Sequence, residues 1–142
     1  MMKITLIEPK IPGPSSLKKM LTSKFNVFPT LCLQQIAGNT PKNYEVNILS
    51  EMHKPIKYNI DSEVIAITCV TPQALRAYEI GDKFRKLGKT VILGGWHPSA
   101  LPDEAKQHAD SVVIGEADYL WRYVLDDIEN NKLKDVYKNN NF

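Results

Sequence analysis

The chain alternates between short apolar runs and longer segments of mixed polarity. Five of the runs have the length and the β-branched content of strands, and they fall at residues 3–7, 44–49, 64–68, 90–93 and 111–114. The third and fourth runs are almost continuously apolar, which is typical of strands buried on both faces of a parallel sheet. The alternation therefore predicts parallel strands joined by helical crossovers.

The clearest helix is predicted over residues 72–88, between the third and fourth strands. Thr71 is a candidate N-cap, Pro72 suits the first helical position, and Gly88 can supply the left-handed residue that ends a helix. An approximate apolar stripe runs along this segment through Leu75, Tyr78, Ile80, Phe84 and Leu87. Strand, helix, glycine and strand together predict a βαβ unit.

The other connections are predicted to be helical as well. A short helix is expected over residues 98–108, and apolar residues at helical spacing predict another over 118–131. The first crossover is less regular, because residues 11–16 have the composition of a loop and Pro29 interrupts the following helical segment. We expect one crossover built from a broken helix there.

These elements predict an α/β domain with a doubly wound, five-stranded parallel sheet of flavodoxin-like or Rossmann-like type. The expected strand order is 2-1-3-4-5, with helices on both faces. We expect the domain to occupy residues 1–134, and residues 135–142 to be a polar tail that starts a linker to an absent domain. Sheets of this class bind ligands beside the carboxyl ends of their strands. Here those ends are followed by loops at residues 8–16, 50–59, 68–72, 94–99 and 115–118.

Composition narrows the possible partners. The chain has 142 residues, 43% of them hydrophobic and 24% charged, as in an ordinary globular domain. Its formal net charge is only +2 and the charges are interspersed, which argues against nucleic acid as the main partner. No apolar run approaches the roughly 20 residues of a membrane span, and the N-terminal run is too short for a signal peptide, so we expect a cytoplasmic protein.

Cysteine usage gives no sign of a metal site. Cys32 and Cys69 are far apart and show neither a CxxC motif nor a Cys/His ligand spacing, so neither a zinc site nor a disulfide framework is indicated. We expect both to be buried thiols.

The end of the fourth strand carries the strongest candidate binding residues. Gly94 and Gly95 would let a flat ligand approach bare backbone, or would simply form a tight turn. Trp96 offers a ring for stacking. His97 is a candidate proton carrier, metal ligand or hydrogen-bond donor to a cofactor, with an ordinary surface histidine as the alternative.

Further candidates flank the third and fifth strands. Thr68, Cys69 and Thr71 stand at the tip of the third strand, where hydroxyl groups can bind a ligand, although Thr71 also has the capping role. Gly115 and Glu116 follow the fifth strand, and Glu116 is equally explained as an acidic residue at a helix N-terminus. The chain lacks GxGxxG, GxxxxGK[ST], GxSxG and EF-hand motifs, which removes the simplest nucleotide, hydrolase and calcium hypotheses.

Several segments, taken together and in order, resemble the N-terminal cobalamin-binding domain of cobalamin-dependent radical S-adenosylmethionine enzymes. They are residues 66–74 with 77–80, 91–99 with 101–105, and 109–117. The resemblance spans most of the chain, and Gly94 and Gly95 match the glycine pair of that family. It implies a Rossmann-like module that holds a corrinoid across the carboxyl edge of its sheet. The partner would be a barrel domain that carries an iron–sulfur cluster and S-adenosylmethionine.

The sequence departs from this family in two ways. The CxxxCxxC motif of the barrel is missing, so the cluster and S-adenosylmethionine are expected only in an absent domain, and this chain alone is not expected to be catalytic. Many cobalamin domains also carry DxHxxG after the first strand, with a histidine that coordinates cobalt, whereas this chain has Glu8 and Pro9 there, followed by Lys10-Ile11-Pro12-Gly13. The resemblance then implies cobalamin bound beside Glu8 and Pro9 without that histidine ligand.

Three functions follow from these observations. The leading one is a cobalamin-binding module present without its catalytic domain. The second is a cofactor-free scaffold or interaction domain of the same fold, which the missing DxHxxG motif favours. The third is a flavin or nucleotide binder of flavodoxin type, for which Ser15 and Ser16 are the only phosphate-binding candidates after the first strand.

Overall fold

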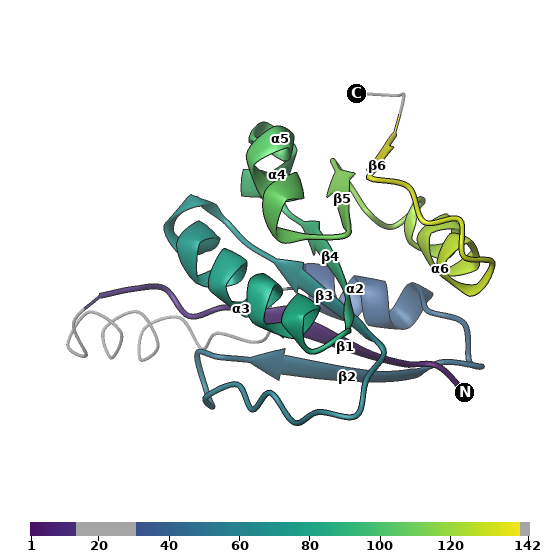
Figure 1. Cartoon of the computed structure of the whole chain (residues 1–142), viewed down its shortest axis with the longest axis horizontal. Coiled ribbons are helices and arrows are strands. Elements are labelled where there is room, and N and C mark those ends of the chain that lie inside the picture. Colours follow the sequence, from purple (N-terminus) through teal and green to yellow (C-terminus); the bar gives the residue numbers. More distant parts are fainter. Residues whose placement is uncertain (14–30, 140–142) are drawn as a thin grey trace.

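A single parallel sheet organises the part of the chain that the computed structural model describes, residues 1–13 and 31–139 (Figure 1). Its six strands lie in the order β2-β1-β3-β4-β5-β6, and every neighbouring pair is parallel. The predicted doubly wound class and the order of the first five strands are confirmed. The strands are β1 Lys3–Glu8, β2 Glu45–Ser50, β3 Val64–Thr68, β4 Thr90–Gly94, β5 Ser111–Ile114 and β6 Val136–Lys138.

The sixth strand corrects the predicted count of five. It forms inside residues 135–142, which the sequence led us to expect as a polar tail. Tyr137 is the reason, because its ring is only 5% exposed and its hydroxyl donates a hydrogen bond to the Asp127 carboxylate at 2.6 Å. A three-residue edge strand with two apolar residues gives little signal in a sequence. That residues 135–142 start a linker to a further domain stays a prediction.

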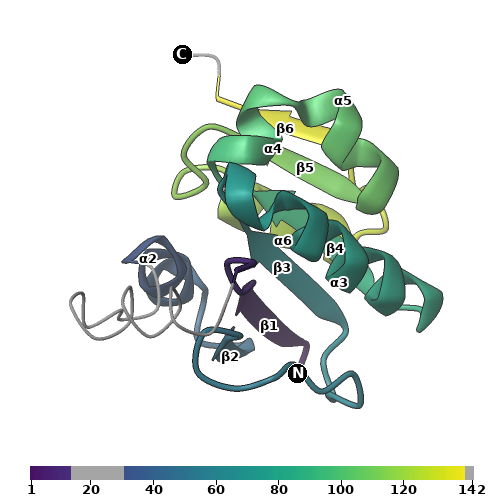
Figure 2. The same cartoon turned by 90° about the vertical axis from the view of Figure 1, so that its left-hand side faces the viewer.

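Helices cover both faces of the sheet, as predicted (Figure 2). Residues of α3 and α5 pack against one face, and residues of α2 and α6 pack against the other. Within the described residues, none of the helices has the length and apolar character needed to cross a membrane. The helices are α2 Leu31–Asn39, α3 Ala74–Lys86, α4 Trp96–Ala100, α5 Pro102–Ala105 and α6 Trp121–Glu129, with 3-10 turns η1 Thr71–Gln73 and η2 Lys106–His108.

The side chains of each strand alternate between two cores. In β1, Ile7 joins the core under α3, whereas Leu6 joins the core under α2 and α6. Phe84 fills the first core and Trp121 the second, and both are almost fully buried. Burial on both faces explains why the central strands are continuously apolar in the sequence.

Helix boundaries differ from the prediction in two places and agree with it at Gly88. The Thr71 side chain does not cap the helix, because Thr71 lies in the preceding turn η1 and α3 has no side-chain capping hydrogen bond; the Gln73 side chain accepts from the Val70 N–H at 3.1 Å at the start of that turn. The helix predicted over 98–108 is divided into α4, α5 and η2. Gly88 has the predicted left-handed conformation, with φ of 77°. The predicted break near Pro29, most of the loop at 11–16, and Ser15 and Ser16 lie outside the described residues.

Candidate functional site

A cavity of about 900 Å³ opens at the carboxyl edge of the sheet, on the face covered by α2 and α6. Its floor is apolar and comes from residues of four adjacent strands. Helices α2 and α6 contribute to its walls, with Leu33 and Ile36 from α2 and Trp121 from α6. The floor consists of Leu6, Ala66, Ile92 and Val113. The cavity thus lies at the edge where sheets of this class bind their ligands.

The structure brings most of the predicted site residues to this cavity and leaves four away from it. Those that line the cavity are Thr68, Cys69, Gly94, Gly95, Trp96, Gly115 and Glu116. Those that are not part of its lining are Glu8, Pro9, Thr71 and His97. Most of the candidates at the ends of β3, β4 and β5 therefore share one cavity, whereas Thr71, His97 and the candidates of the first loop lie outside its lining.

Only glycine fits at position 95, because of its backbone conformation and the atoms around it. Its φ is 101°, and a Cβ atom at this position would lie 2.8 Å from both the Cys69 carbonyl oxygen and the Thr68 hydroxyl oxygen. Gly94 has no such conflict, since a Cβ there would meet only atoms of Val113 at 3.9 Å. Of the two explanations left open by the sequence, a tight turn accounts for Gly95, while Gly94 lines the cavity without any steric need for glycine.

Hydrogen bonds join the ends of three strands at this rim. The Cys69 N–H donates to the Gly94 carbonyl at 3.1 Å, which ties β3 to β4. The Ser99 hydroxyl donates to the Gly95 carbonyl at 2.7 Å and accepts from the Gly115 N–H at 2.9 Å. Ser99 therefore connects the turn after β4 to the end of β5. Ser99 is not among the predicted site residues, because both of its partners are backbone groups, which leave no pattern in the sequence.

His97 is held by the protein itself. Its side chain is 7% exposed, and its ring nitrogens lie 3.2 Å from the Thr71 hydroxyl and 3.1 Å from the Glu104 carboxylate. Hydrogen bonds from His97 and then from Tyr78 lower the pKa of Glu104 below its ordinary value. Both polar atoms of the imidazole thus have partners from neighbouring elements.

The first loop is fixed to its neighbours in a similar way. Glu8 is 4% exposed and accepts a hydrogen bond from the Ser50 hydroxyl at 2.9 Å. The carbonyl of Pro9 accepts one from the Gln73 amide at 2.7 Å. These contacts position the end of β1 against β2 and η1.

The two cysteines have different surroundings. Cys69 is buried as predicted, and burial raises the pKa of its thiol to about 12. The prediction that Cys32 is buried was wrong, because it lies exposed in the first turn of α2. Its sulfur is 3.8 Å from the Thr68 hydroxyl oxygen, at the rim of the cavity. Burial of a residue near a helix end depends on how that helix docks, which periodicity does not reveal.

Sequence reasoning missed the contribution of the helices to the cavity. The rule that ligands bind at strand ends directs attention to loops, whereas Cys32, Gln35 and Ile36 line the cavity from α2 and Trp121 lines it from α6. The apolar spacing of α6 was visible in the sequence, and it is the signal that could have placed Trp121 against the sheet.

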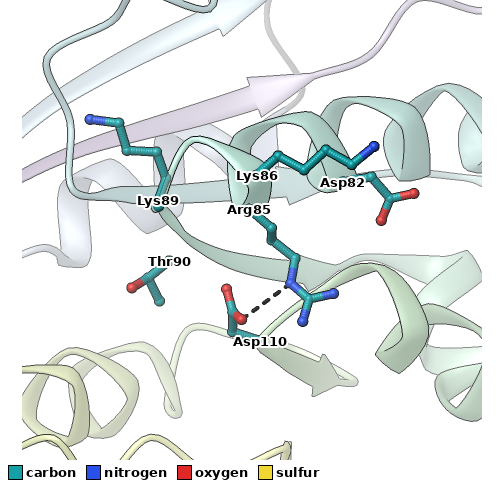
Figure 3. A pocket seen from close by; sticks show the side chains of 7 residues that line it. Asp82, Arg85, Lys86, Lys89, Thr90 and Asp110 are labelled. Carbon is teal, nitrogen blue, oxygen red and sulfur yellow. Dashed lines mark hydrogen bonds and ion pairs between the residues drawn. The ribbon is translucent and has the colours of Figure 1, made fainter.

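A second hollow, of about 630 Å³, lies at the opposite edge of the sheet, beside the start of β4 (Figure 3). Its lining is charged, and its acidic groups already have partners. Arg85 contacts Asp110 at 3.2 Å, and Asp82 contacts His108 at 2.9 Å. The other lining residues are Lys86, Gly88, Lys89 and Thr90. This hollow has no apolar floor and lies away from all the predicted site residues.

Comparison with known proteins gives two related enzymes. The chain is 46% identical over 113 residues, or 79% of its length, to bacteriochlorophyllide d C-8(2)-methyltransferase of Chlorobaculum tepidum. It is 37% identical over 130 residues, or 90% of its length, to bacteriochlorophyllide d C-12(1)-methyltransferase of the same organism. These matches cover 25% and 28% of the two enzymes, so the chain spans about a quarter of the curated relatives that it matches. No family model matches the chain.

Proposed function

We propose that this domain is a cobalamin-binding module of a radical S-adenosylmethionine methyltransferase. One observation carries the proposal, namely the large cavity with an apolar floor that opens beside Gly94 and Gly95 at the carboxyl edge of the sheet. The sequence resemblance described above and the similarity to two methyltransferases support it. The role of this chain would be to hold the corrinoid, and the attached catalytic part would perform the reaction.

The residues of the cavity suit a corrinoid. Its macrocycle is broad and carries amide groups at its edge, so it needs open backbone and a few polar partners at a rim. Gly94 and Gly95 leave the backbone bare, and Thr68, Gln35 and Glu116 supply hydrogen-bonding groups. The apolar floor can take a flat, weakly polar part of the cofactor. A volume of about 900 Å³ is at the upper end of the range for small-molecule sites.

When bound, cobalamin supplies a cobalt centre that can carry a methyl group, while the protein groups bind and orient it. Thr68 and Gln35 would bind polar groups at the edge of the macrocycle, and Trp121 would exclude water from the floor. We assign no protein residue to cobalt, since the lining residues include no histidine. An iron–sulfur cluster and S-adenosylmethionine would belong to the part of the longer relatives that this chain does not span.

Retention of corrinoid by the purified domain tests the proposal. We expect hydroxocobalamin to stay bound through desalting and to keep its visible absorbance. Ala66→Leu on the floor and Ala100→Trp at the rim should each reduce retention, because both side chains would extend into the cavity. Gly95 is unsuitable for such a test, since any side chain there collides with Cys69.

Leu75→Trp is the matched control for added bulk. Leu75 is 79% exposed on α3, the helix that covers the opposite face, so retention should match that of the unmodified domain. Absence of corrinoid from the unmodified domain would contradict the proposal. Flavin mononucleotide bound instead would favour a flavodoxin-type binder, and neither ligand bound would favour a cofactor-free scaffold.

A further inference from the structure

The imidazole of His97 is a buried polar group directly beside the rim of the cavity. It belongs to the first turn of α4, two residues after the turn glycine Gly95. Its side chain is 7% exposed, so its ring nitrogens must find partners within the protein. Those partners come from two other elements, Thr71 of η1 and Glu104 of α5.

The chemistry of these partners determines which ring nitrogen carries the hydrogen when the His97 ring is neutral. A carboxylate only accepts hydrogen bonds, so Nε2, at 3.1 Å from Glu104, carries the hydrogen. Nδ1 then accepts from the Thr71 hydroxyl at 3.2 Å. If the ring is protonated, Nδ1 donates instead, and the same hydroxyl oxygen accepts after its hydrogen rotates away. Both hydrogen bonds therefore survive a change in the charge of the ring.

The backbone of His97 connects this arrangement to the rim. Its N–H donates to the Cys69 carbonyl at 3.2 Å. That carbonyl is the group that would lie 2.8 Å from a Cβ on Gly95. A shift of α4 away from η1 would therefore separate the turn after β4 from the end of β3.

Other titratable groups face His97 from each element packed against it. Glu104 of α5 has a side chain that is 50% exposed, and it also accepts from the Tyr78 hydroxyl of α3 at 2.8 Å. The Tyr78 ring lies 6.1 Å from that of His97 and stacks at 4.2 Å on His108 of η2. The buried thiol of Cys69 lies at the end of β3. Glu104 is the anionic group in direct contact with the imidazole.

We propose that His97 is a positioning residue for the rim of the cavity. Its hydrogen bonds to Thr71 and Glu104 hold the turn after β4 against the end of β3, and they do so in both charge states of the ring. The rim is then insensitive to pH over the range of about 5 to 8 in which histidines commonly change charge. Any effect of His97 on corrinoid retention rests on the proposed function. Its role in holding the turn after β4 against the end of β3 does not.

Hydrogen exchange of the backbone amides of Cys69 and His97, followed by NMR, tests this inference. In the unmodified domain, protection corrected for the intrinsic rate should be the same at about pH 5.5 and pH 8. Thr71→Val removes the partner of Nδ1 in both charge states, and the cost is larger when Nδ1 carries a hydrogen; Glu104→Gln removes the negative charge beside the ring. Each variant should therefore lose roughly tenfold more protection at the lower pH than at the higher one, as expected for a buried donor or charge without its partner.

Two controls separate this role from a general loss of packing. Thr71→Ser keeps the hydroxyl and should restore the flat pH profile. His53→Gln changes an exposed histidine in another part of the chain and should leave the profile unchanged. A flat profile in both test variants, or a pH-dependent one in the unmodified domain, would overturn the inference.

Hydroxocobalamin retention is measured in parallel at the two pH values. We expect it to follow the protection of the Cys69 and His97 amides in every variant. A domain that retains no corrinoid at either pH contradicts the proposed function, and the exchange data still decide the role of His97. If corrinoid retention and amide protection both fell at the lower pH in the unmodified domain, the role inferred for His97 would be contradicted, while the proposed cobalamin binding would not.

Discussion

At the scale of single residues, Gly95 is a position where the surrounding atoms leave no room for a side chain. Alanine there would place its Cβ 2.8 Å from two oxygen atoms, at a φ of 101° that L-residues rarely adopt. We expect Gly95→Ala to lower the free energy of unfolding by about 1–3 kcal/mol. Urea denaturation followed by circular dichroism measures this change.

Gly38→Ala is the matched control for that substitution. Gly38 lies in α2 with nothing within 4 Å of an added Cβ. Alanine has the higher helix propensity, so this variant should be more stable by about 0.5–1 kcal/mol. If Gly95→Ala were as stable as the unmodified domain, the close approach of the turn to Cys69 would be contradicted.

The sequence located some residues of the rim and left the orientation of others open. Gly94 and Trp96 were predicted for the site because they directly follow a strand, and position along the chain is enough to place them at an edge. The orientation of His97 depends on Thr71 and Glu104, which lie 26 and 7 residues away in the sequence. Only the packing of η1, α4 and α5 brings these groups together.

At the scale of elements, the strands with long apolar runs were predictable and β6 was not. Four of the five predicted strands, β1, β3, β4 and β5, bury most of their side chains, which leaves a pattern in the sequence. The short β6 depends mainly on Tyr137, whose hydroxyl donates to Asp127 at 2.6 Å and accepts from the Lys134 N–H at 3.1 Å. Burial, together with the hydrogen bond to Asp127, raises the pKa of Tyr137 to about 12.

Substitution of Tyr137 tests whether β6 contributes to the stability of the domain. We expect Tyr137→Ala to cost about 2–4 kcal/mol, because it leaves a cavity in the core under α6. Tyr137→Phe removes only the hydroxyl and should cost about 0.5–1.5 kcal/mol. Tyr123→Ala, at an exposed position of α6, is the control and should have little effect on the urea midpoint. Equal midpoints for all three would show that β6 adds no stability.

At the scale of the whole molecule, the strand order was predictable because few topologies are compatible with sustained strand–helix alternation. The cavity was not, since it depends on how α2 and α6 pack over the sheet. No local pattern encodes that packing, which results from contacts such as the hydrogen bond from the Trp121 indole to the Thr40 hydroxyl at 2.8 Å.

One ion pair connects several parts of the fold and makes global stability depend on pH. Glu51, in the turn after β2, is 5% exposed and accepts hydrogen bonds from Arg76 Nε of α3 at 3.0 and 3.1 Å. It also accepts from the Lys10 N–H at 3.1 Å. Burial raises the pKa of Glu51, but the hydrogen bonds and positive charge outweigh it, so the pKa lies below its ordinary value.

A lowered carboxyl pKa stabilises the fold where the carboxylate is charged. The contribution of Glu51 is complete above the unfolded-state pKa of about 4.3, and it is lost as the pH falls through the lower pKa of the folded state. We expect Glu51→Gln to cost roughly 1–3 kcal/mol at neutral pH, because Arg76 loses its buried partner. At pH values below the folded-state pKa both proteins carry a neutral side chain, so the difference between their urea midpoints should become small.

Glu79→Gln separates this effect from the loss of any acid near Arg76. Glu79 also contacts Arg76, at 3.0 Å, but its side chain is 67% exposed, and exposed pairs contribute little. The urea midpoint of Glu79→Gln should therefore match that of the unmodified domain at every pH. If the urea midpoint of Glu51→Gln were lowered equally at acid and neutral pH, the glutamine would be disturbing packing. The charge of Glu51 would then not explain the loss of stability in acid.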